Sequence, residues 1–560
     1  MSEASKQNDG QQDEPKSVSN QQALSPLVKD WLFWLALAVG GFFLSLTLRF
    51  GFGVDQVICA YGAWIWKTYH LPPYVGVWDQ NFIGIFIIHR IAIELFGRSM
   101  LGFRIYDFAL QLVGLAMMFY ITRRFAGSSV AALLASILYV IFYYSQGSWG
   151  TIERESFVFF FLLLALALSL ALENSKWFRI ILVGFICGFV FLIRPTYGLA
   201  WPIFGVLFLI EGIRERPRMI WGELFVFGLC CLAPSLVTIL TYAHMGHLED
   251  LYLATIWYNF NIYGSVAQPN LPLAARYLFV PKWIYTTNSL GLFAGLLGVL
   301  LQIVWWGKCR NQKLFITISA LALASLASYI FQAKYFPYHL IPFWGFLTIF
   351  SGYGFGKIGT LLAGAKHHRV YPAIFYFMVI VFTVFEIPSS LLVYSVQDAF
   401  VSFEQGYIDD PAPTSFFRQL TADSYFAADY LKPKLARKDK IEFLGSNPLI
   451  PYLLPRQLPS RFCSPLNLLV MPRNGKATEM QKKWFQEYAS AVIRVRPRFF
   501  IIQDPVGDLR NYNDNFAGFN LSITSYKTAL QQIFPELQEF LNQNYHPDRK
   551  IGTIEIWELN

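Results

Sequence analysis

The segment WLFWLALAVGGFFLSLTLRF, residues 31–50, decides the fold because it is apolar and long enough to cross the hydrocarbon core of a bilayer. Its one charged residue, Arg49, lies near its end. Two carboxylates, Asp55 and Asp79, follow in the stretch beside this predicted span. A carboxylate close to hydrocarbon is costly unless it is paired or lines a wet cavity. Both acids are therefore candidates for a functional site at a membrane surface.

The composition indicates a multi-span membrane protein. Of the 560 residues, 55% are hydrophobic and only 14% are charged, which is too apolar for a soluble chain of this length. The net charge of +9 does not indicate nucleic-acid binding, because Lys and Arg are scattered in small groups between apolar runs, as orientation signals are. The six cysteines form neither a disulfide framework nor a zinc-binding spacing.

Ten further apolar runs predict about eleven transmembrane helices in all. They cover residues 103–122, 128–146, 155–174, 179–197, 199–213, 222–243, 288–306, 314–332, 339–356 and 371–396. Alternate loops between these runs carry the basic residues, which predicts a cytoplasmic N-terminus. Two other apolar segments, residues 81–96 and 248–263, are expected to lie as interfacial helices on the outer surface.

The chain divides into three predicted parts. Residues 1–30 are polar and predict a disordered cytoplasmic tail. Residues 31–396 form the membrane domain, and residues 397–560 form an extracytoplasmic soluble domain because an odd number of spans places them outside. Its predicted strands are 441–444, 498–502 and 553–557, and its predicted helices lie near 415–431, 478–494 and 527–543. The fold class is a polytopic α-helical membrane protein with a C-terminal α/β domain.

With this topology, acidic and basic residues converge on the outer face of the membrane domain. A sugar or peptide could reach them from outside while a lipid tail stays in the bilayer. The converging residues are Asp55, Tyr74, Asp79, Glu153, Arg154, Glu155, Arg194, Lys334, Tyr338 and His339.

Several motifs resemble those of C-type (GT-C) polytopic glycosyltransferases of the protein O-mannosyltransferase and aminoarabinose transferase group. They begin with Asp55 after the first span, the Pro72-Pro73-Tyr74 turn and Trp78-Asp79-Gln80-Asn81 at the start of the first interfacial helix. Three more follow in order: Glu153 to Glu155, GFVFLIRP at 188–195 and KYFPYH at 334–339. Two departures stand out. Many members carry Asp-Glu where this chain has Asp55-Gln56, and Lys-Pro-Pro where it has Gln80-Asn81-Phe82.

The resemblance implies transfer of a sugar from a polyprenyl-phosphate donor to an acceptor on the extracytoplasmic face, with inversion at the anomeric carbon. Asp55 would act as the general base, and Asp79 would orient the acceptor or help to hold a divalent cation such as Mg²⁺ or Mn²⁺. The expected contacts to the donor phosphate are Arg194, Lys334, His339 and Arg104. The expected acceptor or metal contacts are Glu153, Glu155, Tyr74 and Tyr338. A lipid, a glycan or a protein remains open as acceptor, and a bacterial inner membrane is the expected location.

Other interpretations of the same residues remain open. A polytopic lipid-linked glycan ligase or polymerase shares the donor class and topology. A secondary transporter needs midplane sites and usually an internal repeat, and a membrane scaffold needs no acids beside the bilayer. Structural roles are also open: helix caps for Asp55 and Asp79, an interfacial arginine for Arg194, and an ion pair between Arg104 and Asp107.

Overall fold

The computed structural model of the protein describes residues 26–215, 218–264, 288–305, 311–334, 336–364, 370–385, 387, 415–472, 474–504, 521 and 523–560. Most of the predicted N-terminal tail lies outside the described residues, as do residues 397–414 at the start of the predicted C-terminal domain.

Apolar helices lie in all eleven predicted ranges as far as the structure describes them, and residues 388–396 of the last range lie outside the described residues. In the described part of the chain, eight helices are long and apolar enough to cross a membrane. They are α1 (Trp31–Leu46, extended to Arg49 by a 3-10 turn), α4 (Met100–Ala126), α7 (Arg154–Ala171), α8 (Lys176–Ile193), α9 (Ala200–Glu215), α10 (Ile220–His244), α14 (Gln312–Gln332) and α15 (Ile341–Ala363). Three shorter apolar helices accompany them: α5 (Ser129–Ser145), α13 (Ser289–Val304) and α16 (Val370–Phe385). The protein is thus a multi-pass membrane protein, as predicted.

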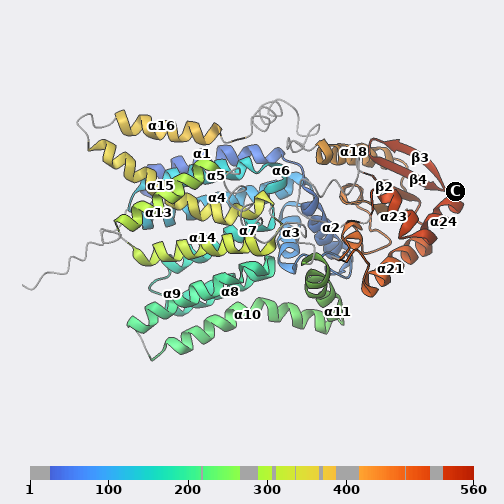
Figure 1. Cartoon of the computed structure of the whole chain (residues 1–560), viewed down its shortest axis with the longest axis horizontal. Coiled ribbons are helices and arrows are strands. Elements are labelled where there is room, and N and C mark those ends of the chain that lie inside the picture. Colours follow the sequence, from blue (N-terminus) through green and yellow to red (C-terminus); the bar gives the residue numbers. More distant parts are fainter. Residues whose placement is uncertain are drawn as a thin grey trace, which may run out of the picture.

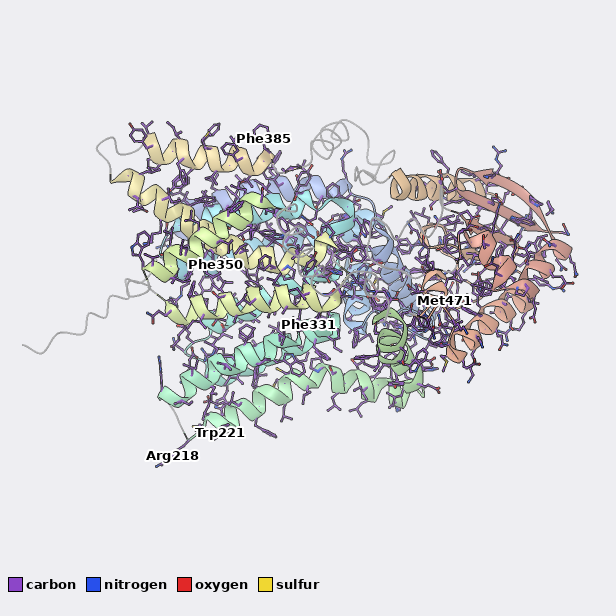
Figure 2. All side chains as sticks on the ribbon, viewed as in Figure 1. Arg218, Trp221, Phe331, Phe350, Phe385 and Met471 are labelled. Carbon is purple, nitrogen blue, oxygen red and sulfur yellow. The ribbon has the colours of Figure 1, made fainter. Side chains whose placement is uncertain are left out.

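The helix bundle is apolar on its outside as well as in its core. Trp221, Phe331 and Phe385 are 73%, 71% and 79% exposed, whereas Phe350 is buried (Figure 2). An exposed apolar surface of this kind suits contact with lipid tails. Small residues let some helices pack closely: a Cβ added to Gly188 of α8 would lie 2.2 Å from the carbonyl oxygen of Cys231 in α10.

Three short helical segments separate the bundle from the C-terminal domain. They are α2 (Val54–Tyr69), α3 (Ile83–Phe96) and α11 (Leu248–Tyr252), which continues through π-helical turns η4 (Leu253–Trp257) and η5 (Asn259–Tyr263). In Figure 1 they lie between the long helices on the left and the red C-terminal domain on the right. The two segments predicted as interfacial, 81–96 and 248–263, are therefore helical and lie at one end of the bundle.

The C-terminal domain is built on a four-stranded sheet in the order β1-β2-β4-β3. Strands β1 (Ile441–Leu444) and β2 (Phe499–Gln503) are parallel, and β4 (Ile554–Leu559) runs antiparallel to both β2 and β3 (Tyr545–Ile551). The helices around the sheet are α18 (Ser415–Leu431), α19 (Leu449–Leu453), α20 (Leu466–Leu469), α21 (Glu479–Val495), α23 (Tyr526–Gln532) and α24 (Pro535–Asn544).

Two details of this domain differ from the prediction. The helix expected near 527–543 is divided in two, because Pro535 starts a new helix at its first position, where its missing N–H costs nothing. Strand β3 was not predicted, since its sequence YHPDRKI is polar and contains a proline. It is an edge strand, where charged residues and proline are tolerated. The predicted fold class is otherwise confirmed.

Candidate active site

Asp55 lies in the first turn of α2, at the end of the bundle that faces the C-terminal domain. The cap position belongs to Gly53, so Asp55 is not the helix cap. Its carboxylate accepts a hydrogen bond from Arg154 Nη2 at 2.8 Å. The Asp55 side chain is 36% exposed while that of Arg154 is only 6% exposed. A buried guanidinium thus orients a carboxylate that a substrate can reach.

Asp79 is buried in the loop that leads into α3. Its Oδ1 accepts a hydrogen bond from the backbone N–H of Asn81 at 2.8 Å, and the Asn81 side chain in turn accepts one from Arg154 Nη1. Burial raises the pKa of Asp79 to about 6, although the Asn81 bond opposes this shift. Phe82 holds the cap position of α3, so Asp79 is not a helix cap either. Arg154 thereby links the two acids.

Glu153 precedes α7 and is also buried. Burial, and then the negative charge of Asp55, raise its pKa well above the ordinary value. Gln56 Nε2 lies 3.4 Å from Glu153 Oε1 and donates to the carbonyls of Ser148 and Thr151 at 2.9 and 2.7 Å. A glutamate in place of Gln56 would offer no donor to these oxygens. The departure from the Asp-Glu motif therefore has a structural use here.

A second cluster, of cations around one acid, lies at the same end of the bundle. Glu155 in the first turn of α7 is fully buried, and its Oε1 lies 3.4 Å from Arg194 Nε and 3.6 Å from His339 Nε2. Arg194 follows α8 and also donates to the side chain of Gln332. Neither carboxylate oxygen of Glu155 and neither ring nitrogen of His339 has a hydrogen-bond partner among the described residues. We call Glu155, Arg194, His339 and Lys334 the cation cluster.

Lys334 completes this cluster from the turn before α15. It is buried, donates to the carbonyl of Tyr263 at 3.0 Å and lies 4.0 Å from the centroid of the Tyr263 ring. Burial, and then the positive charge of Arg194, lower its pKa to about 7. Repulsion between neighbouring cations makes this a favourable place for an anion.

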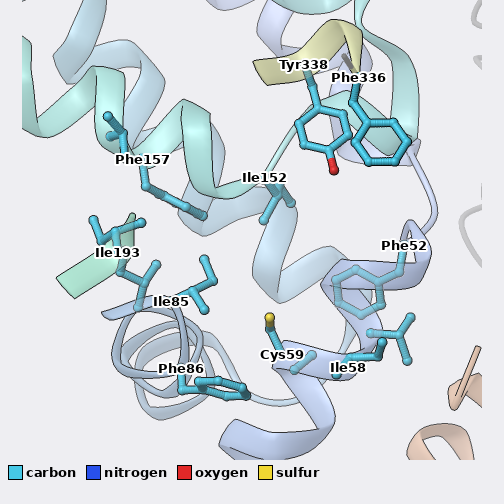
Figure 3. Close-up of a cluster of buried hydrophobic side chains, with 14 of the residues drawn as sticks. Phe52, Ile58, Cys59, Ile85, Phe86, Ile152, Phe157, Ile193, Phe336 and Tyr338 are labelled. Atoms are coloured by element: carbon cyan, nitrogen blue, oxygen red, sulfur yellow. The ribbon is translucent and has the colours of Figure 1, made fainter. Parts of the chain in front are cut away.

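Figure 3 shows a buried apolar cluster, and several of its residues are close in sequence to the two groups of charges. Ile152 directly precedes Glu153, Ile193 directly precedes Arg194, and Cys59 lies one helical turn after Asp55. The rings of Phe336 and Tyr338 are stacked with centroids 5.5 Å apart. Charges beside such a low-dielectric surface interact more strongly than they would in water.

Arg104, which is expected to contact the donor phosphate, donates hydrogen bonds mainly to backbone carbonyls. It is completely buried in α4 and donates to Phe50 O at 3.0 Å, Thr151 Oγ1 at 2.6 Å, Ser148 O at 3.2 Å and the carbonyl of Gly51. These bonds fix the loops that carry Asp55 and Glu153. The Arg104 guanidinium is thus engaged by these protein oxygens, and its contact with the donor phosphate stays a prediction. Its expected partner, Asp107, accepts hydrogen bonds from Tyr143 and Gln111.

Tyr74, which is expected to contact the acceptor, also forms a hydrogen bond within the protein. Its side chain is completely buried and its hydroxyl donates to the carbonyl of Asn81 at 2.8 Å. Its φ of 73° lies in the left-handed region, so this bond holds a tight turn in place. Contact between an acceptor and the Tyr74 hydroxyl would require this bond to break.

The C-terminal domain supplies residues that the sequence analysis missed. The backbone N–H of Trp78 donates to the carbonyl of Arg461 at 2.8 Å, and the Trp78 ring packs against Trp484 with centroids 5.1 Å apart. The guanidinium of Arg461 donates to Tyr74 O at 2.9 Å and to Asp250 Oδ1 at 2.6 Å. Asn467 Nδ2 lies 3.5 Å from Asp79 Oδ2. These contacts from the C-terminal domain therefore hold the loop that carries Asp79 in place.

The residues around the acids do not fit a divalent cation. The described residues contain no group of three or more His, Cys, Asp or Glu side chains that could hold a metal ion. The guanidinium of Arg154 links Asp55 to Asn81, which binds Asp79, and Glu155 faces Arg194 and His339. A cation bridging these acids would be repelled by the arginine between them.

Comparison with known proteins identifies part of this membrane domain. Residues 82–238, less than a third of the chain, match the model of the family described as dolichyl-phosphate-mannose-protein mannosyltransferase. The expected resemblance to C-type glycosyltransferases is confirmed. No curated protein matches this chain significantly.

Solved structures extend the similarity beyond this region. ArnT from Cupriavidus metallidurans bound to undecaprenyl phosphate is 13% identical, with a TM-score of 0.56 over 94% of this chain and 97% of ArnT. Its apo form gives 13% identity and a TM-score of 0.55 over the same shares. AglB, the oligosaccharyltransferase from Archaeoglobus fulgidus, is 12% identical, with a TM-score of 0.48 over 95% of this chain and 74% of AglB. The likeness to ArnT establishes the C-type fold along nearly the whole chain.

Proposed function

We propose that this protein is an inverting membrane glycosyltransferase that uses a polyprenyl-phosphate sugar as donor and acts on the extracytoplasmic side, with Asp55 as its general base. The observation that carries the proposal is the arrangement of one reachable carboxylate near a buried cluster of cations. Asp55 is 36% exposed, whereas Lys334 and His339 are 3% and 1% exposed. Transfer from a lipid phosphate needs a base for the acceptor and positive charge for the leaving group.

In the proposed reaction, the acceptor hydroxyl oxygen forms a bond to the anomeric carbon as the bond from that carbon to the phosphate oxygen breaks. The hydroxyl proton passes to Asp55, and polyprenyl phosphate departs with the electron pair. Arg194, Lys334 and His339 neutralise the charge that grows on the phosphate. A strong general acid, which a glycosidase uses to protonate an alcohol leaving group, is unnecessary because phosphate leaves readily.

Arg154 has a positioning role in this scheme. It holds Asp55 at 2.8 Å and also binds the side chain of Asn81. Asp79, held by Asn81, would orient the acceptor, and Glu153 and Tyr338 remain proposed acceptor contacts. The acceptor itself is a lipid, a glycan or a protein that approaches between the membrane domain and the C-terminal domain. No step requires a metal ion.

Two observations outside the site support the lipid donor and the side of the membrane. The structure of ArnT, which shares the fold, holds undecaprenyl phosphate. Alternate loops of the sequence carry the basic residues, which favours a cytoplasmic N-terminus and an extracytoplasmic C-terminal domain. A bacterial inner membrane is the proposed location.

The test is release of free polyprenyl phosphate by the purified, lipid-reconstituted protein, supplied with a panel of polyprenyl-phosphate sugars and a crude acceptor extract. Wild-type protein should consume one donor, and Asp55→Asn should bind that donor without turnover. Glu94→Gln is the matched control, because Glu94 is an acid on neighbouring α3 that pairs with Lys67 and lies outside the site. Full activity of Asp55→Asn would remove Asp55 as the base. Absence of binding and consumption across the panel would reject the glycosyltransferase.

A further inference from the structure

Glu155 is an unusual residue within the cation cluster. Its side chain is 0% exposed, yet neither carboxylate oxygen accepts a hydrogen bond from any described residue. Buried carboxylates normally accept several hydrogen bonds, and each exception calls for an explanation. The neighbours of Glu155 Oε1 are Arg194 Nε at 3.4 Å and His339 Nε2 at 3.6 Å.

The guanidinium of Arg194 beside Glu155 needs a negative charge nearby even when no ligand is present. Arg194 is only 15% exposed, and Lys334 and His339 are almost completely buried. An uncompensated buried charge is strongly destabilising. Glu155 contacts two of the three basic residues, and burial, followed by the positive charge of Arg194, lowers the pKa of Lys334. Glu155 therefore supplies the counter-charge of the empty site.

We propose that Glu155 is an internal counter-anion that competes with the lipid phosphate for Arg194 and His339 and so weakens the binding of the product, polyprenyl phosphate. This inference rests on the proposed function, since it takes the cation cluster to be the phosphate site. Glu155 is thus a positioning residue that sets how firmly phosphate is held, in place of the acceptor or metal contact expected from the sequence.

The difference in charge between the donor and the product explains how this counter-anion could act. The donor is a phosphodiester with one negative charge, and the product is a phosphomonoester with up to two. Basic residues without a counter-charge would bind the product more tightly than the donor, and release would limit turnover. A fixed carboxylate beside the phosphate repels a phosphate with two negative charges about twice as strongly as a phosphate with one. Glu155 thereby favours exchange of product for a new donor.

The test is binding of undecaprenyl phosphate to the reconstituted full-length protein, with steady-state kinetics once a donor is known. Glu155→Gln keeps the shape of the side chain and removes its charge. It should bind undecaprenyl phosphate about tenfold more tightly, and it should lower both the KM for the donor and kcat, because product release slows. Glu155→Asp keeps the charge and should bind close to wild type.

A matched control is Glu223→Gln. Glu223 is a buried acid in α10 with one carboxylate oxygen that lacks a hydrogen bond within the described structure, and it lies outside the cation cluster. Its loss should leave the affinity for undecaprenyl phosphate unchanged. Structural damage weakens binding, so tighter binding by Glu155→Gln alone would support the counter-anion. Equal or weaker binding by Glu155→Gln would overturn it while the proposed function stands. Failure of the wild-type protein to bind undecaprenyl phosphate would overturn both.

Discussion

The acids around Asp55 and the cation cluster lie at the same end of the helix bundle but differ in how their polar atoms are satisfied. Asp55 and Asp79 accept hydrogen bonds from Arg154 and from the backbone of Asn81. In the cation cluster, the carboxylate of Glu155 and the ring of His339 have no hydrogen bonds within the described structure. The acids are thus already organised by the protein, whereas the cation cluster is suited to receive hydrogen-bond acceptors from a ligand.

The two groups also differ in what supports them. The loop of Asp79 is held by the C-terminal domain through Trp78, Arg461 and Asn467. The cation cluster is held by the ends of membrane helices, with Arg194 following α8 and His339 preceding α15. Changes to the acids or their supports should therefore alter kcat, and changes to the cation cluster should alter donor binding.

The largest effect is expected for Asp55→Asn. Loss of the base should lower kcat by about 10³-fold, while the affinity for the donor stays within about twofold, since Asp55 does not belong to the cation cluster. Single-turnover transfer and equilibrium donor binding, measured on the same preparation, would show this separation. A parallel loss of donor affinity would break the distinction between the two groups.

Arg194→Ala should give the next largest effect, a fall in kcat/KM of about 10²-fold that includes a higher KM for the donor. The variant also leaves Glu155 buried without its nearest cation, so the double variant Arg194→Ala/Glu155→Gln should unfold at a higher temperature than Arg194→Ala. Arg179→Ala is the matched control. Arg179 lies on α8, the helix that Arg194 follows, and pairs with Glu211 at 2.6 Å, away from the cluster. An equal rise in donor KM for Arg179→Ala would contradict the prediction.

The third prediction concerns pH and Asp79. Burial raises its pKa from 3.8 to about 6, so the folded protein binds more protons than the unfolded chain between these values. The contribution of Asp79 to the free energy of unfolding should therefore be greatest below about pH 4 and fall by up to about 3 kcal/mol as the pH rises through 6, an equilibrium factor of about 10². Asp79→Asn should lack this component. Thermal unfolding of both proteins from pH 4 to 7 would reveal it, and identical pH dependence would count against a buried, titrating Asp79.

The sequence predicted the helices well because length and apolarity are local properties of each run. The sequence analysis also predicted that the ends of alternate spans meet on one side of the membrane. It therefore placed Asp55, Glu155, Arg194 and His339 on the same face. It did not predict that Arg104 binds the carbonyls of Phe50 and Gly51, because backbone acceptors carry no side-chain signal.

The support from the C-terminal domain was missed for a different reason. Asn467 is 388 residues from Asp79 along the chain. No local pattern links residues at such a distance. The strand β3 was missed because its composition is that of an exposed edge.

The smallest effect is expected for Arg461→Ala. This variant tests whether the C-terminal domain supports the acids but not the cation cluster. Arg461 ties Tyr74 O to Asp250 and also pairs with Glu487 at 2.8 Å. Its loss should let the Asp79 loop move and lower kcat by about tenfold, because small misplacements near the reacting atoms are costly. Donor affinity should not change, since none of these contacts reaches the cation cluster.

Arg498→Ala is the control for this last comparison. Arg498 belongs to the same domain and also forms two ion pairs, with Asp439 at 2.8 Å and Glu558 at 3.1 Å, but it contacts no residue of the site. Both variants lose two ion pairs, so a similar loss of thermal stability is expected for each. A fall in kcat in Arg461→Ala alone would locate the effect at the acids. Equal falls in both would mean that the domain acts only through overall stability, and the contrast between the acids and the cation cluster would lose its support from the C-terminal domain.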